Sequence, residues 1–233
     1  MKKSVMFSCF LLMIAFSLTK AFSQDCTSYM PVKEGTRMEM KHFDAKDKLE
    51  SSTRMTILKK HNTPDGYAID VQVNSFDAKG KEAMSNKLTF RCSHGEFIWD
   101  MNDLMKGMPA MEGMEDMKIK ISGSDLKFPS RLQVGQKLED AEINFAMESG
   151  GMVMMTIKVR IINRKVVAKE NITTPAGTFD CYKLSYEVDT ESMFSMKMFQ
   201  TDWIAEETGV VRSENYDQNN KLTSYSLLTE LKR

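Results

Sequence analysis

Methionine carries the strongest chemical signal in this chain. The segment 101–117, MNDLMKGMPAMEGMEDM, holds six methionines in seventeen residues, and Met105, Met108, Met111 and Met114 recur at every third position. Thioethers at this spacing suit a soft ion such as Cu(I) or Ag(I). The same unbranched, polarizable side chains also pack against varied apolar ligands or partners. A third alternative is that they only fill the core.

The periodicity of this segment argues against an ordinary core helix. An α-helix turns by about 100° per residue, so a repeat of three sweeps roughly 240° from Met105 to Met117. Pro109 and its neighbouring glycines also interrupt a helix. We therefore expect one short helix near 100–106, then a broken segment with some thioethers exposed.

A second group of methionines lies on predicted strands. Met152 and Met154 are two residues apart, as are Met196 and Met198, so each pair shares a face of its strand. We expect the two pairs to lie on neighbouring antiparallel strands and to line one wall of a concave sheet, which segment 101–117 caps. The predicted ligand contacts are Met105, Met108, Met111, Met114, Met152, Met154, Met196 and Met198, with Trp99 and Trp203 as aromatic walls.

The same argument predicts an order of oxidation. A strand can bury a whole face, whereas the broken segment cannot hide every thioether. Mild peroxide should therefore convert Met108, Met111 and Met114 to sulfoxides before Met154 and Met196.

No pattern in the chain indicates an enzyme. His42, His61 and His94 are scattered, without the spacing of a zinc site. The chain has no G-x-S-x-G elbow and no glycine-rich phosphate loop. Its 32 basic and 32 acidic side chains are balanced, so no electrostatic case exists for nucleic acid. We expect a protein that is not an enzyme, has no cofactor and binds no nucleic acid.

The N-terminus has the features of a secretory signal peptide. Lys2 and Lys3 precede an apolar stretch, 5–18, that is short for a membrane span, and Ala21-Phe22-Ser23 supplies small residues for cleavage. We predict that residues 1–23 are removed and that 24–233 form one domain with no transmembrane segment. The residues before Cys26 are too polar to favour a lipid anchor. The predicted location is periplasmic or extracellular.

Three cysteines remain after this cleavage, and export favours their oxidation. An odd number cannot all pair within one chain. We predict a Cys26–Cys92 disulfide that ties the mature N-terminus to a strand end, and a buried free thiol at Cys181.

The elements that position these residues are strands. The motifs HFDAKDK (42–48), SFDAKGK (75–81) and NYDQNNK (215–221) each contain an aromatic residue, Asp, three residues and Lys. Asp accepts backbone N–H bonds in a turn, and Gly80 and Asn220 tolerate the positive φ that such hairpin turns require. Further turn signals are found at 62–66, 93–95, 149–151 and 174–178.

Turn signals at this spacing, between runs of β-type composition, predict ten to twelve antiparallel strands. The expected fold is mainly β, a curved antiparallel meander that forms an open or half barrel, with one short Met-rich helical segment. Residues 128–143 should form a crossing between two sequence lobes, about 26–122 and 125–233.

Several stretches carry a family resemblance: CTSYMPVKEGTRMEM, FIWDMNDLM, LKFPSRLQVGQKLEDAE, NRKVVAKENITTPAGTFDCYKLSYEV and TDWIAEETGVVRSENYDQNNK. They resemble the TapB-like family of secreted Gram-negative bacterial proteins, a β-rich domain of unknown function. The most specific part is TPAGTFDCYKL followed by W-x-A-E-x-x-G-V-V-R-S-E. The resemblance implies export and an open, barrel-like sheet, and it supplies no catalytic residues.

The expected function is non-catalytic binding of an apolar small molecule or an envelope protein in the concave, methionine-lined sheet. One alternative is a Cu(I) or Ag(I) binding protein that uses the Met-rich segment. Another is a structural envelope protein with no ligand.

Overall fold

The computed structural model describes residues 27–99 and 118–233, and all regular structure in these residues is β. The strands are β1 (Arg37–Asp44), β2 (Leu49–Thr63), β3 (Gly66–Asp77), β4 (Glu82–Ser93), β5 (Glu96–Trp99), β6 (Lys118–Gly123), β7 (Leu126–Pro129), β8 (Ala141–Ser149), β9 (Met152–Thr174), β10 (Gly177–Glu191), β11 (Ser195–Ala205), β12 (Gly209–Tyr216) and β13 (Leu222–Lys232).

These strands form one 13-stranded sheet in the order β6-β8-β9-β10-β11-β12-β13-β1-β2-β3-β4-β5-β7. Every paired neighbour is antiparallel, which confirms the predicted antiparallel meander, although the described residues contain more strands than expected. The predicted helix near 100–106 lies outside the described residues. No helix of the described part has the length and apolar character needed to cross a membrane.

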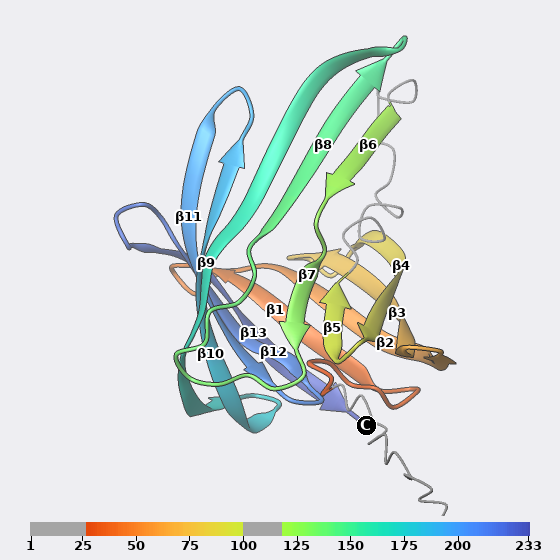
Figure 1. Cartoon of the computed structure of the whole chain (residues 1–233). Coiled ribbons are helices and arrows are strands. Elements are labelled where there is room, and N and C mark those ends of the chain that lie inside the picture. The colour runs from red at the N-terminus through yellow and green to blue at the C-terminus, as the bar shows by residue number, and fades with distance from the viewer. Residues whose placement is uncertain (1–26, 100–117) are drawn as a thin grey trace, which may run out of the picture.

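The sheet bends strongly because its two edge strands, β6 and β7, are consecutive in the chain (Figure 1). Only residues 124–125 separate them, so the two ends of the sheet approach each other at this point. At the end of β6, Gly123 allows a close approach to the paired strand β8, since a Cβ there would lie 2.0 Å from the Glu142 carbonyl oxygen. β6 and β7 do not pair, so the sheet is open rather than a closed barrel.

The repeated hairpin motif folds as its sequence predicts. In the β1–β2 turn, Asp44 Oδ1 accepts backbone N–H bonds from Lys46 at 2.8 Å and Lys48 at 2.9 Å. Asp77 and Asp217 make the equivalent pairs of bonds in the β3–β4 and β12–β13 turns. The positive-φ positions are Asp47, Gly80 and Asn220. The turn signals at 62–66, 93–95, 149–151 and 174–178 also lie between consecutive strands, as expected.

The main core lies inside the curve of the sheet. Ile57, Ile69 and Val71 of β2 and β3 are almost fully buried, and they belong to the same cluster as Leu184 of β10 and Ile204 of β11. The segment before β1 closes one side of this cluster, because the Tyr29 hydroxyl accepts the Leu132 backbone N–H at 3.1 Å. Beyond this core, β6 and the distal parts of β8–β11 extend away as a separate arm (Figure 1).

Candidate functional site: an apolar wall on the β8–β11 arm

The arm carries a continuous apolar surface on one face, which we call the interior wall. Its strands are β6, β8, β9, β10 and β11, and strand register brings its members together. The interior wall consists of Ile119, Ile121, Ile143, Phe145, Met147, Met155, Ile157, Val159, Ile161, Val188, Met196 and Met198.

The register shows that these side chains share one face. Met147 of β8 lies opposite Ile119 of β6 and Met155 of β9. Further along β9, Ile161 lies opposite Val188 of β10, which in turn lies opposite Met198 of β11. Because alternate residues of β10 point the same way, Val188 shares its face with Leu184 of the main core. The interior wall is therefore an extension of the core face.

The opposite face of the arm is charged. Lys120 and Glu148 pair across β6 and β8 at 2.8 Å, and Arg160 of β9 contacts Glu191 of β10 at 2.5 Å. Lys197 of β11 also forms an ion pair with Glu187. This alternation of apolar and charged residues is typical of an antiparallel sheet with one solvated face. The interior wall is thus the apolar face of the arm, which is stabilised when other atoms shield it from water.

Burial along the interior wall is incomplete and uneven. Ile143 and Met147 are buried, whereas Phe145, Ile157 and Val159 are only partly buried. Ile119 is 42% exposed and Met196 is 55% exposed. Large apolar side chains this exposed on one contiguous face indicate a surface for a partner or ligand.

A buried polar cluster lies at the foot of the interior wall, where it meets the core. The Asp202 carboxylate accepts the Tyr186 hydroxyl at 2.6 Å and the Gln200 amide at 3.0 Å. Burial raises the pKa of Asp202, although hydrogen bonds from Tyr186, Ser213 and Gln200 partly offset this effect. The carboxyl group is therefore more easily protonated than a surface aspartate.

Arg164 of β9 is a second buried ionisable group at this position. It is 2% exposed, and its hydrogen bonds among the described residues go to backbone carbonyls rather than to a carboxylate. Its guanidinium donates instead to the backbone carbonyls of Glu139 and Lys127, the latter at 3.1 Å, and lies 4.9 Å from the Phe128 ring centroid. Burial lowers the pKa of Arg164.

A small cavity separates this cluster from the edge strands β5 and β7. Its volume is about 40 Å³, and its lining includes Trp99, Phe128, Ile161, Arg164 and Tyr186. A single water molecule needs roughly 10–15 Å³, so the cavity has room for a few heavy atoms and not for a whole organic ligand. A larger molecule that entered this cavity would therefore have to extend along the adjoining interior wall.

The predicted methionine wall is wrong in its strand arrangement. β9 and β11 are not neighbours, because β10 lies between them. Met196 of β11 lies opposite Thr190 of β10, and Thr190 lies opposite Val159 of β9. Val159 is seven residues from Met152 along β9, so Met152 and Met196 are far apart along the strands. Met152 and Met154 are at the tip of the β8–β9 hairpin, where the register shifts, and are 68% and 62% exposed. The two methionine pairs therefore do not meet on one wall.

The other predicted contacts have different positions. Met198 lies on the interior wall and is partly buried, and Trp99 lines the small cavity. Trp203 lies opposite Lys183 and Arg212, donates its indole N–H to Glu170 at 2.7 Å, and faces away from the interior wall. It cannot be a wall of that surface. Met105, Met108, Met111 and Met114 lie outside the described residues.

The cysteine predictions are partly confirmed. Cys181 is a buried free thiol, as expected, and burial raises its pKa to about 12. Cys92 is buried, whereas Cys26 lies outside the described residues, so the Cys26–Cys92 disulfide stays a prediction. Among the described residues no cluster of three or more His, Cys, Asp or Glu side chains is placed to hold a metal ion.

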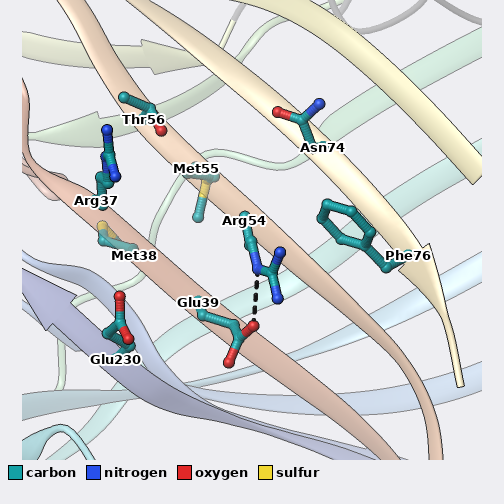
Figure 2. Close-up of a pocket in the computed structure, with 9 residues that line it drawn as sticks. All are labelled: Arg37, Met38, Glu39, Arg54, Met55, Thr56, Asn74, Phe76 and Glu230. Carbon is teal, nitrogen blue, oxygen red and sulfur yellow. Dashed lines mark hydrogen bonds and ion pairs between the residues drawn. The ribbon is translucent and has the colours of Figure 1, made fainter. Parts of the chain in front are cut away.

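A second concavity lies on the outer face of β1, β2, β3 and β13 (Figure 2). It measures about 470 Å³ and is mainly polar. Its central charges are mutually satisfied, because Arg54 Nε donates to Glu39 Oε1 at 2.9 Å and the Arg54 guanidinium covers the Phe76 ring at 4.5 Å. Asn74 is bonded to Glu82 and Ser85. This groove therefore offers few unused groups to a ligand.

Sequence reasoning missed most of the interior wall and all of the polar cluster. The signal for the wall was present as alternation in INFAM (143–147) and MTIKVRI (155–161), where every second residue is apolar. The methionine pattern pointed instead to Met152 and Met154, which lie at the tip of the β8–β9 hairpin. Asp202, Tyr186 and Arg164 are too far apart in sequence for any local pattern to join them.

Comparisons with known proteins agree with this fold. A family model described as DUF3108-like matches residues 33–228. The chain is similar to a candidate lipoprotein from Parabacteroides distasonis, with 27% identity and a TM-score of 0.73 over 89% of this chain and 100% of that chain. It is also similar to a candidate exported protein with a YmcC-like fold from Bacteroides fragilis, with 25% identity and a TM-score of 0.72 over the same shares. No curated protein matches the chain.

These relatives are consistent with the export that the sequence predicts, without separating periplasm from cell exterior. The resemblance to a β-rich domain of unknown function is confirmed at the level of the matched family. The TapB-like name stays a prediction.

Proposed function

We propose that this chain, which belongs to the DUF3108-like family, is an exported, non-catalytic protein that binds a long apolar chain against the interior wall. The observation that supports this proposal is the incomplete burial of an apolar face that continues directly from the core. The two similar structures, described as a candidate lipoprotein and a candidate exported protein, support the exported setting.

The energetics favour a chain-like ligand. Burial of one CH₂ group contributes about 0.8 kcal/mol, so contact with even six or seven such groups on the wall would supply roughly 5 kcal/mol. The wall follows β9 from Met155 to Ile161, a span of about 20 Å at roughly 3.3 Å per residue, and has neighbouring strands on both sides. We favour an extended acyl chain because such a chain can contact apolar side chains along this whole span.

The soft-metal alternative gains no support from the described methionines. Met152 and Met154 lie at one hairpin tip, whereas Met196 lies on another strand beyond β10. A Cu(I) site needs thioethers that converge on one point. Any such site would have to be built from Met105, Met108, Met111 and Met114, which lie outside the described residues.

Binding can be tested with the fluorescent probe 1-N-phenylnaphthylamine, displaced by hexadecane or palmitic acid. The informative variant is Ile157→Gln, which places an amide in the middle of the interior wall. Its matched control is Ile162→Gln, because Ile162 is also partly buried on β9 but lies opposite Glu187 on the charged face.

We expect Ile157→Gln to weaken displacement about tenfold or more, as a buried amide without a partner costs on the order of 1–3 kcal/mol. Ile162→Gln should bind as the unaltered protein does. If neither hexadecane nor palmitic acid displaces the probe from the unaltered protein, the proposal is wrong and a structural role without ligand is favoured. Equal weakening by both variants would also contradict it.

A further inference from the structure

One residue that lines the small cavity at the foot of the interior wall has an unused hydrogen-bond donor. The indole Nε1 of Trp99 is buried and has no hydrogen-bond partner. Trp99 itself is held firmly, with its ring edge-on to Phe90 at 5.5 Å and tilted against Phe128 at 6.0 Å. A buried N–H without an acceptor costs on the order of 1–3 kcal/mol, so its presence requires an explanation.

A second group in the same cavity has unused capacity. Arg164 has five N–H donors, and among the described residues its hydrogen bonds go to the carbonyls of Glu139 and Lys127. Its charge is buried and is hydrogen-bonded to these carbonyls rather than to a carboxylate. By contrast, the acceptor groups nearby are already engaged, because Asp202 receives bonds from Tyr186 and Gln200. The cavity therefore has spare donors and few spare acceptors.

The cavity is also positioned to receive one end of a molecule on the interior wall. Ile161 belongs both to the wall and to the lining of the cavity. Tyr186, another lining residue, is two residues from Val188 on the same face of β10. At about 40 Å³ the cavity matches a terminal group of two or three heavy atoms.

We infer that the cavity is the receptor for the head of the bound ligand, and that this head presents a carbonyl oxygen to the Trp99 indole N–H and the Arg164 guanidinium. The ligand class is thus an acyl chain that ends in a carboxylic acid or an ester. This inference rests on the proposed function, since it assigns one end of the molecule that the interior wall would hold.

The test compares three probes of equal chain length: palmitic acid, methyl palmitate and hexadecane, each displacing 1-N-phenylnaphthylamine. Trp99→Phe removes the donor and keeps an aromatic ring. Trp203→Phe is the matched control, because it also removes an indole donor but from the opposite face of the sheet. We expect Trp99→Phe to weaken palmitic acid and methyl palmitate about five- to tenfold, the value of one hydrogen bond. Hexadecane should be unaffected, and Trp203→Phe should change none of the three.

The outcomes separate this inference from the proposed function. If Trp99→Phe leaves all three probes unchanged, or weakens hexadecane as much as the acid, the head assignment is wrong while binding to the wall stands. If no probe binds the unaltered protein, both fail. A comparison of palmitic acid with methyl palmitate shows whether the bound carbonyl oxygen belongs to a carboxylic acid or to an ester.

A second readout does not depend on affinity. The chain has two tryptophans, so in Trp203→Phe the tryptophan emission comes from Trp99 alone. Palmitic acid should shift its emission because a new acceptor bonds the indole N–H, whereas hexadecane should not. Identical emission with both probes would overturn the head assignment.

Discussion

The core half of the sheet and the distal arm have the same alternation of apolar and polar residues but very different burial. On β3, Ile69 and Val71 are 0% exposed, whereas on β9 Ile157 and Val159 are only partly buried. Alternation decides which face of a strand is apolar, and it does not decide whether anything covers that face. The difference indicates that the core half maintains the fold and that the arm presents a surface.

Charged groups also differ in burial between the outer face of the arm and the junction of the arm with the core. The outer face of the arm has ion pairs such as Lys120–Glu148, in which Lys120 is largely exposed. Such pairs contribute little to stability. At the junction of the two regions, Asp202 and Arg164 are buried and held by specific hydrogen bonds. The junction is therefore the position where substitutions should affect both stability and binding.

The largest expected effect is on the free energy of unfolding, when one isoleucine of the core half and one of the arm are each replaced by alanine. Ile69→Ala should lower the free energy of unfolding by about 3–4 kcal/mol, because it leaves a cavity in a fully buried site. Ile157→Ala, the same change on the interior wall, should cost about 1 kcal/mol, since water can occupy the vacated space. Urea denaturation measures both values. Equal losses would mean that the wall is as much a part of the core as β3.

The junction should show a pH dependence of its own. Because burial raises the folded-state pKa of Asp202, the folded protein retains this proton at a pH where the unfolded chain has lost it. The contribution of Asp202 to stability is therefore complete below its ordinary pKa near 4 and is lost as pH rises through the folded-state value. Asp202→Asn should remove this dependence.

The measurement for Asp202 is the unfolding free energy of both proteins from about pH 3 to pH 7. Only the difference between them is informative, because groups such as Asp217 act in the opposite direction. Backbone hydrogen bonds from Lys221 and Asn219 outweigh its slight desolvation and lower the pKa of Asp217, so its contribution is lost as pH falls. A difference that grows toward low pH in favour of Asp202→Asn would contradict this prediction.

Methionine oxidation should distinguish the regions without a large effect on stability. The expected protection of Met154 and Met196 by their strands was wrong, since they are 62% and 55% exposed. Mild peroxide should instead oxidise these two before Met38 and Met40, which are 4% and 6% exposed. Peptide mass spectrometry over time gives the order. Similar oxidation rates at all four methionines would show that Met154 and Met196 are shielded from solvent.

Local sequence patterns predicted most of the β architecture, for reasons that the turns make clear. Asp44, Asp77 and Asp217 each bond to backbone N–H groups within four residues, so the information that forms the turn lies within the turn. Patterns did not predict which strands meet at a distance. Met152 and Met196 were expected on neighbouring strands, but β10 lies between their strands, and Met152 is at the tip of the β8–β9 hairpin.

Residue order was enough to predict the antiparallel sheet, the hairpin turns and the two faces of each strand, because these features depend on neighbours along the chain or on alternation. The folded chain alone reveals that β6 and β7 are the open edges, that the arm extends past the core, and that Trp99 and Arg164 share one cavity. Those features depend on curvature and on contacts between residues far apart in sequence, for which no local pattern carries information.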